Sequence, residues 1–407
     1  MPQPDNIALP PGCLTGLKIF DLTRVLAGPT CVQMLADLGA DVIKIERPGV
    51  GDDTRGFAPP AMPGTTESAY FAGANRNKRS VTLDISSAEG QQLALALIAK
   101  SDVLVENFKQ GALAKYGLGY EQLKEKFPNL IYCSITGFGQ TGPYASRPGY
   151  DSVVQAMGGV MSLTGEPDGL PQKVGVPLAD LFAGLYACIG VLAALQYRNR
   201  TGRGQQIDIG MLDTSVAWLA NQGMNYLATG ENPQRLGNAH PNIAPYQVFE
   251  TADGAIMITI GNDPTFQRFC NKFGMPELAI DTRFATNAAR VGNRSALTKA
   301  LTPIFKRHPG AWWTERLEAE KIGYGPINRL SDVFSDPHVI ARGDVIEMVH
   351  ASGAPIKLIA NPVRLSAAPP TYRIAPPPLG LHTEEVLREE LGLSADEIVR
   401  LRDKGVL

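Results

Sequence analysis

The chain has 407 residues, of which 44% are hydrophobic and 19% are charged. This composition is globular, and the length exceeds what one hydrophobic core usually fills, so we expect about two or three domains and take two as the working number. The 38 basic and 40 acidic residues are scattered along the chain and give a formal net charge of -2. No block of Lys and Arg could follow a phosphate backbone, so a nucleic-acid partner is not expected.

The thiols and the apolar segments indicate the compartment. Five cysteines, an odd number, lie far apart without a C-x-x-C pair, which argues against a disulfide framework or a zinc site. The first 13 residues lack a basic region followed by an apolar stretch, and no later segment runs about 20 residues without polar groups. We therefore expect a cytoplasmic protein with reduced thiols and no membrane segment.

The first 135 residues alternate strand-like and helix-like segments. Short β-branched runs occur at 17–22, 41–46, 80–84, 102–106 and 130–135. Between the third and fourth runs, Leu93, Leu97 and Ile98 place apolar side chains on one face of a helix. This order predicts a parallel, doubly wound, Rossmann-like α/β sheet.

The second half of the chain has a different pattern. Pro177 opens a long apolar helix that runs to Tyr197, and residues 201–209 read as a turn and another strand. A hairpin-like pair of strands, 246–251 and 255–259, surrounds Asp253-Gly254. A proline-rich segment then precedes two helices, the last opened by a capping box from Ser394 to Glu397. We therefore expect a large α/β domain at 1–212, a linker at 213–235, a smaller α+β domain at 236–345, a returning linker at 346–378, and C-terminal helices at 379–407 that pack on the large domain.

Several common enzyme motifs are lacking. Glu46 closes the second strand, as an acid that holds a ribose would, but the first turn, Thr23–Pro29, is not G-x-G-x-x-G. The sequence has no Walker loop, no H-E-x-x-H and no G-x-S-x-G, and its five histidines are dispersed. Nicotinamide binding, a metal centre and a serine nucleophile are therefore not expected.

Asp180 is the acidic residue of greatest interest. It follows Pro177 by three positions, in the first turn of the long helix, where the helix dipole stabilises an anion by ~0.3–1 kcal/mol. We therefore expect an ionised carboxylate. Acids in first turns usually only complement the dipole, so position alone does not make Asp180 catalytic.

A series of motifs resembles the family III CoA-transferases in the same order over nearly the whole chain. The segments are Thr23–Arg55, with Ala27-Gly-Pro29 and 38–47; 77–80 (NKRS); 106–108 (ENF); 174–180 (VGVPLAD); and 201–204 (TGRG). Each motif is weak alone, but the ordered set is specific. In this family the segment resembling 174–180 carries a nucleophilic aspartate, so the resemblance implies that Asp180 is catalytic.

The resemblance also implies how the substrates are bound. Positions that match the coenzyme A path in the family are Val25, Arg47, Leu83, Asn107, Phe108, Ala112 and Lys115, and positions that match residues around the nucleophile are Leu26, Phe57, Tyr70, Tyr150 and Asp151. The implied substrates are an acyl-CoA and a free carboxylic acid. The reaction passes the thioester from one acid to the other, so we expect no cofactor and no metal.

Two related activities are the alternatives. The racemases of the same superfamily have Gly-His-Asp where this chain has Gly149-Tyr-Asp151, and tyrosine is a poor base at neutral pH. The formyl-CoA:oxalate transferases carry a glycine run and a glutamine where this chain has residues 238–247, with two prolines, and Leu26. The resemblance is greater to the branch acting on C4 to C6 dicarboxylates, typified by succinyl-CoA:glutarate transferases.

A dicarboxylate has a distal charge that needs a partner, and arginine binds a carboxylate through two parallel hydrogen bonds. Arg55 and Arg76 are the candidates. Members of the family also form an interlocked homodimer of ring-shaped subunits, and the connections at 210–231 and 360–378 are candidates for the linkers of such a ring.

Overall fold

The computed structural model describes residues 11–407, which divide into two compact units. Unit 1 contains the residues up to 158 together with 175–218 and 338–407, and unit 2 contains 159–174 and 219–337. The expected small domain was 236–345, so unit 2 begins earlier, ends earlier and includes a separate segment. Arg235 explains why residues 159–174 belong to unit 2. Its guanidinium donates hydrogen bonds to the carbonyl oxygens of Glu166 and Gly169, at 3.2 and 2.6 Å.

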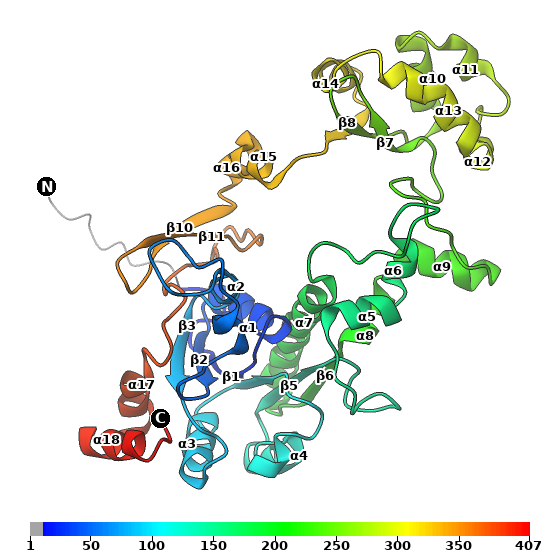
Figure 1. The fold of residues 1–407 in the computed structure, drawn as a ribbon. Helices are drawn as coiled ribbons and strands as arrows, with labels where there is room; N and C mark the ends of the chain where they lie inside the picture. The colour runs from blue at the N-terminus through cyan, green and yellow to red at the C-terminus, as the bar shows by residue number, and fades with distance from the viewer. Residues whose placement is uncertain (1–10) are drawn as a thin grey trace, which may run out of the picture. The chain divides into compact units, whose positions relative to one another are not determined.

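Unit 1 is built on a six-stranded sheet (Figure 1). Its strands are β1 (Lys18–Leu22), β2 (Asp41–Glu46), β3 (Lys78–Thr82), β4 (Val103–Glu106), β5 (Ile131–Thr136) and β6 (Gln206–Gly210). Every pairing is parallel and the order is β3-β2-β1-β4-β5-β6, which confirms the predicted doubly wound sheet. The winding direction reverses between β1 and β4, and sheets of this kind bind ligands at the carboxyl ends of the strands at that point.

Helices cover both faces of this sheet. Ile19 and Phe20 are neighbours on β1 and enter different cores, because successive strand residues point to opposite faces. One core contains residues of α1 (Ala27–Asp37) and α7 (Leu178–Thr201); the other contains residues of α3 (Ala88–Ile98) and α4 (Tyr120–Lys126). Shorter elements of unit 1 are η1 (Asp53–Gly56), α2 (Ala69–Ala72), η2 (Ala114–Tyr116), α5 (Asp151–Met157) and α8 (Met211–Ala217).

Helix α7 is the long apolar helix expected from Pro177 onwards. By length and composition it could cross a membrane. Here Ala183, Ala187 and Val191 are instead buried in a core with Val32 and Leu35 of α1. Packing in unit 1 therefore explains the apolar residues on the face of α7 that carries Ala183, Ala187 and Val191.

The C-terminal segment returns to unit 1. After α16 (Pro337–Arg342) it forms an antiparallel pair, β10 (Val345–Val349) and β11 (Pro355–Ile359), and then α17 (Thr383–Leu391) and α18 (Ala395–Asp403). Val386 and Leu401 are buried in the core that contains α3. Ser394 and Glu397 form the predicted capping box at the start of α18.

Unit 2 contains a three-stranded antiparallel sheet of β7 (Tyr246–Glu250), β8 (Ala255–Thr259) and β9 (Gly323–Pro326). The first two strands form the hairpin predicted around Asp253-Gly254. Trp313, Phe266 and Phe305 are central in its core. The helices of this unit are α6 (Val160–Leu163), α9 (Ala220–Thr229), α10 (Asp263–Lys272), α11 (Pro276–Ile280), α12 (Asn287–Gly292), α13 (Arg294–Phe305), α14 (Gly310–Ala319) and α15 (Leu330–Ser335).

Candidate active site

Asp180 is the third residue of α7 and is half-buried. The start of this helix is capped by Asp151, the first residue of α5, and not by Asp180. Asp151 Oδ1 accepts hydrogen bonds from the backbone N–H of Ala179 at 2.8 Å and, more weakly, of Asp180 at 3.5 Å. Gln155 Nε2 donates to Asp151 Oδ2 at 2.7 Å. Two carboxylates therefore share the first turn of α7.

This arrangement changes the titration of Asp180. Burial and, to a lesser degree, the charge of Asp151 raise the pKa of Asp180 to about 7. With a pKa of about 7 the carboxyl group is only partly ionised at neutral pH, so the helix dipole does not hold it fully charged as expected from the sequence. The positive end of the helix is already compensated by Asp151, which leaves burial and like-charge repulsion to dominate at Asp180.

Two glycines allow the close approaches that place these acids. A side chain on Gly149 would lie 2.3 Å from the Cα of Gly137, so the segment leading to Asp151 crosses directly against the residue after β5. A Cβ on Gly184 would lie 2.7 Å from the carbonyl oxygen of Ala27. Because Asp180 precedes Gly184 by four residues, it lies on the same face of α7, which is directed towards the start of α1.

Aromatic side chains accompany this pair of acids. Burial, followed by the charges of Asp180, Asp151 and Asp52, raises the pKa of Tyr70, so its hydroxyl stays protonated near Asp180. The ring of Phe57 meets that of Tyr70 edge-on, with 5.4 Å between centroids. Tyr150, which precedes the cap, is 70% exposed. The structure thus places Tyr70 and Asp151 close enough to Asp180 to interact with it, and Phe57 against Tyr70, whereas Tyr150 is largely exposed.

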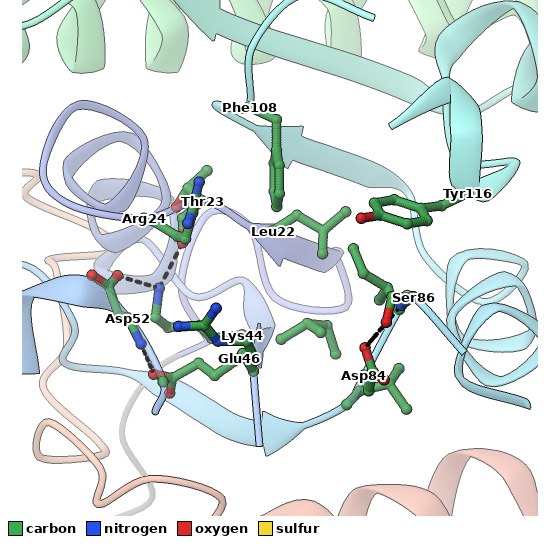
Figure 2. A pocket seen from close by; sticks show the side chains of 15 residues that line it. Leu22, Thr23, Arg24, Lys44, Glu46, Asp52, Asp84, Ser86, Phe108 and Tyr116 are labelled. Carbon is green, nitrogen blue, oxygen red and sulfur yellow. Dashed lines mark hydrogen bonds and ion pairs between the residues drawn. The ribbon is translucent and has the colours of Figure 1, made fainter. Parts of the chain in front are cut away.

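A pocket of about 320 Å³ lies at the carboxyl ends of β1 to β4 (Figure 2). Its position is the one expected for a ligand of a doubly wound sheet. The side chains that line it come from the ends of four strands and the loops that follow them: Leu22, Thr23, Arg24, Lys44, Ile45, Glu46, Arg47, Gly51, Asp52, Leu83, Asp84, Ile85, Ser86, Phe108 and Tyr116.

A buried ion pair fixes the wall of this pocket. Lys44 Nζ lies 3.0 Å from Asp52 Oδ2 and donates to the carbonyl oxygen of Thr23 at 2.8 Å, as Figure 2 shows. Asp52 Oδ1 in turn accepts from the backbone N–H of Val25, at 3.2 Å. Val25 has a φ of 68°, a conformation that a β-branched residue rarely adopts. The loop after β1 is thus held in a defined, strained shape.

The predicted coenzyme A residues are distributed around this pocket. Arg47, Leu83 and Phe108 line it. Asn107 exchanges two hydrogen bonds with the backbone of Arg24, at 2.8 and 2.6 Å. Lys115 lies 4.6 Å from the ring of Tyr116, which lines the pocket. Ala112 lines a second hollow, together with residues of α4, β5 and β6.

Sequence reasoning did not identify seven polar or aromatic residues of the pocket: Thr23, Arg24, Lys44, Asp52, Asp84, Ser86 and Tyr116. Arg24, whose guanidinium lies 4.7 Å from the ring of Phe108, adds a second exposed cation to Arg47. Asp84 and Ser86 follow β3 and are joined by a 2.6 Å hydrogen bond, and Tyr116 stands opposite them (Figure 2). Arg24, Asp84 and Ser86 lie just after the ends of β1 and β3, and that position was the available signal for these three residues.

Arg55 and Arg76 are both bound to internal carboxylates. Arg55 binds Glu46 with two hydrogen bonds of 2.7 Å, and its Nη1 lies 2.9 Å from Glu67. Arg76 is buried and binds both oxygens of Asp37, at 2.9 and 2.6 Å. Each guanidinium therefore has a structural role in unit 1, and neither presents its fork to a substrate carboxylate in this structure.

The carboxylate of Glu46, at the end of β2, is held by several protein partners. Besides Arg55, its carboxylate accepts from Ser80 Oγ at 2.7 Å and from the backbone N–H of Asp52 at 2.9 Å. Burial alone would raise the pKa of Glu46, but the hydrogen bonds and charge of Arg55 and the charge of Lys44 hold it below its usual value. Within residues 11–407, no three His, Cys, Asp or Glu side chains are grouped as metal ligands.

Comparisons with known proteins identify the fold and the family. The family model described as CoA-transferase family III matches residues 14–383. A succinate–glutarate CoA-transferase of Agrobacterium fabrum is 46% identical over 385 residues, which cover 92% of this chain and 95% of that protein. An acetyl-CoA:oxalate CoA-transferase of Acetobacter aceti is 41% identical over 360 residues, covering 88% and 90%.

The same relationship is found among solved structures. The crystal structure of a CAIB/BAIF family protein from Brucella suis has a TM-score of 0.83 and 49% sequence identity. The match covers 93% of this chain and all of that one. With the sheet order, the pocket at the strand ends and the family match in agreement, this chain belongs to the family III CoA-transferases and is an enzyme of that family.

Proposed function

We propose that this enzyme transfers coenzyme A from succinyl-CoA to a C4 to C6 dicarboxylate such as glutarate, with Asp180 as the covalent nucleophile. The observation that carries the proposal is the environment of Asp180, a half-buried carboxyl group with a pKa raised to about 7 by burial and by Asp151. A carboxylate that is poorly stabilised and shielded from water is more reactive towards a thioester than an ordinary surface aspartate.

The reaction proceeds through two kinds of intermediate. The Asp180 carboxylate attacks the thioester carbonyl of succinyl-CoA, which forms a mixed anhydride and expels the CoA thiolate. The thiolate then attacks the aspartyl carbonyl, so that succinate leaves and an aspartyl-CoA thioester remains. A glutarate carboxylate attacks the aspartyl carbonyl of this thioester, which expels the CoA thiolate and forms a second mixed anhydride. The thiolate then attacks the glutaryl carbonyl of that anhydride, so that glutaryl-CoA forms and the Asp180 carboxylate is released. Each bond formed is matched by one broken, and the proton count does not change.

The transient oxyanions need hydrogen-bond donors. The start of α1 is the part of unit 1 that supports this role, because the face of α7 that carries Asp180 is directed towards it. No side chain caps the first turn of α1. Its backbone N–H groups and the helix dipole would therefore act on negative charge that develops beside Asp180. The protonated hydroxyl of Tyr70 is a second donor for the same purpose.

The pocket at the strand ends is suited to the nucleotide part of coenzyme A. Arg24 and Arg47 supply positive charge for phosphate groups, and Phe108 and Tyr116 supply aromatic surface for the base. Tyr70 couples electrostatically both to Asp180 and to Asp52, which lines the pocket. The nucleotide pocket and the nucleophile are thus parts of one region of unit 1.

The choice of acceptor rests on the relatives and on the loop at 238–247. The Agrobacterium fabrum relative is named for succinate and glutarate and is 46% identical, whereas the oxalate relative is 41% identical. The loop here contains Pro241 and Pro245 and no glycine, so it does not supply a flexible glycine run. These features favour the dicarboxylate over oxalate.

One assay tests the proposed reaction. The purified enzyme is mixed with succinyl-CoA and, separately, with glutarate, adipate, oxalate or formate, and new acyl-CoA is followed by mass spectrometry. We expect glutaryl-CoA to form at least tenfold faster than oxalyl-CoA. A faster reaction with oxalate would reject the dicarboxylate assignment, and solvent deuterium entering the α-carbon of a 2-methylacyl-CoA without transfer would favour the racemase alternative.

We also propose that the chain acts as a homodimer, with the interlocked ring-shaped subunits that the resemblance implies. Support comes from α7, on which Tyr186, Ile189 and Leu192 lie three residues apart and remain exposed in the single chain, Ile189 by 61%. A second copy would cover this apolar row. Sedimentation equilibrium should give twice the chain mass, and a fully active monomer would reject this assembly. The cytoplasmic location stays a prediction.

A further inference from the structure

Asp151 caps the start of the helix that carries Asp180, the proposed nucleophile. It belongs to α5, yet its carboxylate caps α7 through the backbone N–H groups of Ala179 and Asp180. Gln155, one turn further along α5 and buried, holds the second carboxylate oxygen at 2.7 Å. Both oxygens of Asp151 therefore accept hydrogen bonds, and its side chain is fixed in one orientation.

The cap could be supplied without a charge. At the N-terminal ends of helices, serine and asparagine cap about as well as aspartate. An aspartate adds a full negative charge at the positive end of α7, beside a second carboxylate that the reaction requires as an anion. This choice costs stability when both acids are ionised, so a role of the Asp151 charge in the reaction would account for it.

We propose that Asp151 is a positioning residue whose charge keeps the Asp180 carboxylate poorly stabilised until Asp180 forms a covalent bond. This inference rests on the proposed function of Asp180. In the free enzyme the two anions repel each other, and the helix end is compensated by Asp151. When Asp180 becomes part of the anhydride or of the aspartyl-CoA thioester, its charge disappears and the repulsion is relieved. Asp151 therefore favours both covalent intermediates over the free carboxylate.

Among the groups near Asp180, Asp151 is the residue whose charge should be tested. From α2, Tyr70 faces it as a neutral hydroxyl. The first turn of α1, towards which Asp180 is directed, contains no acidic residue, and α7 itself has no other acid in its first turn. Among the described residues, Asp151 is the one charged group that perturbs the titration of Asp180.

The test separates the charge of Asp151 from its role as a cap. Asp151→Asn keeps the size and a cap acceptor but removes the charge, whereas Asp151→Glu keeps the charge. The titration of Asp180 is measured directly by carbon-13 NMR of the enzyme labelled at aspartate carboxyl groups, with the resonance assigned from its loss in Asp180→Asn. The same variants are assayed for kcat/KM with succinyl-CoA between pH 5 and 9, and their folding is checked by circular dichroism.

We expect Asp151→Asn to lower the midpoint of Asp180 by about one pH unit and to reduce kcat/KM at high pH by roughly three- to tenfold, since a less basic carboxylate is a weaker nucleophile. The acid limb of the rate profile should move with the NMR midpoint. Asp151→Glu should keep the wild-type midpoint.

An unchanged midpoint in Asp151→Asn, with reduced activity, would overturn the proposal and leave Asp151 as a structural cap. If Asp151→Asn does not fold, Asp151→Ser supplies another neutral cap for the same titration. Failure of the wild-type enzyme to transfer coenzyme A would reject the proposed function alone, because the NMR titration needs no turnover.

Discussion

Asp151 and Asp180 share one end of helix α7, and the carboxylate of Asp151, not that of Asp180, accepts the hydrogen bond from Ala179 N at 2.8 Å. The two acids thus have different environments within one turn. Asp151 is held by Gln155 and by backbone donors, while burial and the charge of Asp151 raise the pKa of Asp180 to about 7. A carboxyl pKa raised by burial and by a neighbouring acid, as at Asp180, is typical of active sites.

The rate should depend on pH through Asp180. Because the nucleophile must be ionised and its pKa is raised to about 7, kcat/KM for succinyl-CoA should rise between pH 6 and 8 and level off above. Stopped assays in a constant-ionic-strength buffer series would give the midpoint. A profile that is flat from pH 5 to 8 would show that the reacting group titrates elsewhere.

The same raised pKa should affect stability. An acid whose pKa is higher in the folded than in the unfolded state destabilises the protein as pH rises, from the unfolded value near 4 up to the folded value near 7. Asp180→Asn removes this titration. We expect its Tm to equal that of the wild type at pH 4 and to exceed it by roughly 2–5 °C at pH 8. Equal Tm values at both pH values would contradict the raised pKa.

Arg47 should affect the binding of the CoA substrate and not of the free acid. It is exposed and lines the pocket at the end of β2. Arg47→Gln should raise the KM for succinyl-CoA by about tenfold, the cost of roughly one charge-assisted hydrogen bond, with little change in the KM for glutarate. Arg388→Gln, which removes a surface arginine paired with Glu384, is the matched control. Equal effects of Arg47→Gln on both substrates would reject its assignment.

Arg76 should be needed for stability. Its buried pair with Asp37 means that Arg76→Met leaves an uncompensated acid, at a cost of about 3–5 kcal/mol in the free energy of unfolding. Asp37→Asn combined with Arg76→Met should cost less than the sum of the single changes. Urea unfolding measures all three variants. A stable Arg76→Met with a KM raised only for glutarate would restore the substrate role suggested by the sequence.

Much of unit 1 could be predicted from the sequence. The five β-branched runs became β1 to β5 within about two residues, because strands buried on both faces leave a clear apolar signal. The boundary of unit 2 could not be predicted in full. The segment at 159–174 joins it through the contacts of Arg235 with Glu166 and Gly169, which are far apart from it in sequence.

The candidate site, like the fold, could be predicted from the sequence only in part. The resemblance indicated Asp180 and Tyr70, which interact electrostatically, and Phe57, which packs on Tyr70, but it gave no sign that Asp151 caps α7. The side-chain partners of Arg55 and Arg76 also depend on three-dimensional contacts. An arginine before or after a strand has the same sequence pattern whether it binds a substrate or, as here, Glu46 and Asp37.

The central claim is that Asp180 forms a covalent bond with the substrate. The enzyme is incubated with succinyl-CoA without an acceptor acid, treated with hydroxylamine, digested and examined by mass spectrometry. We expect the peptide that contains Asp180 to carry a hydroxamate, at a level that falls when glutarate is added before the trap, and we expect no such product in Asp180→Asn. An unmodified Asp180 peptide under conditions of full turnover would contradict the account.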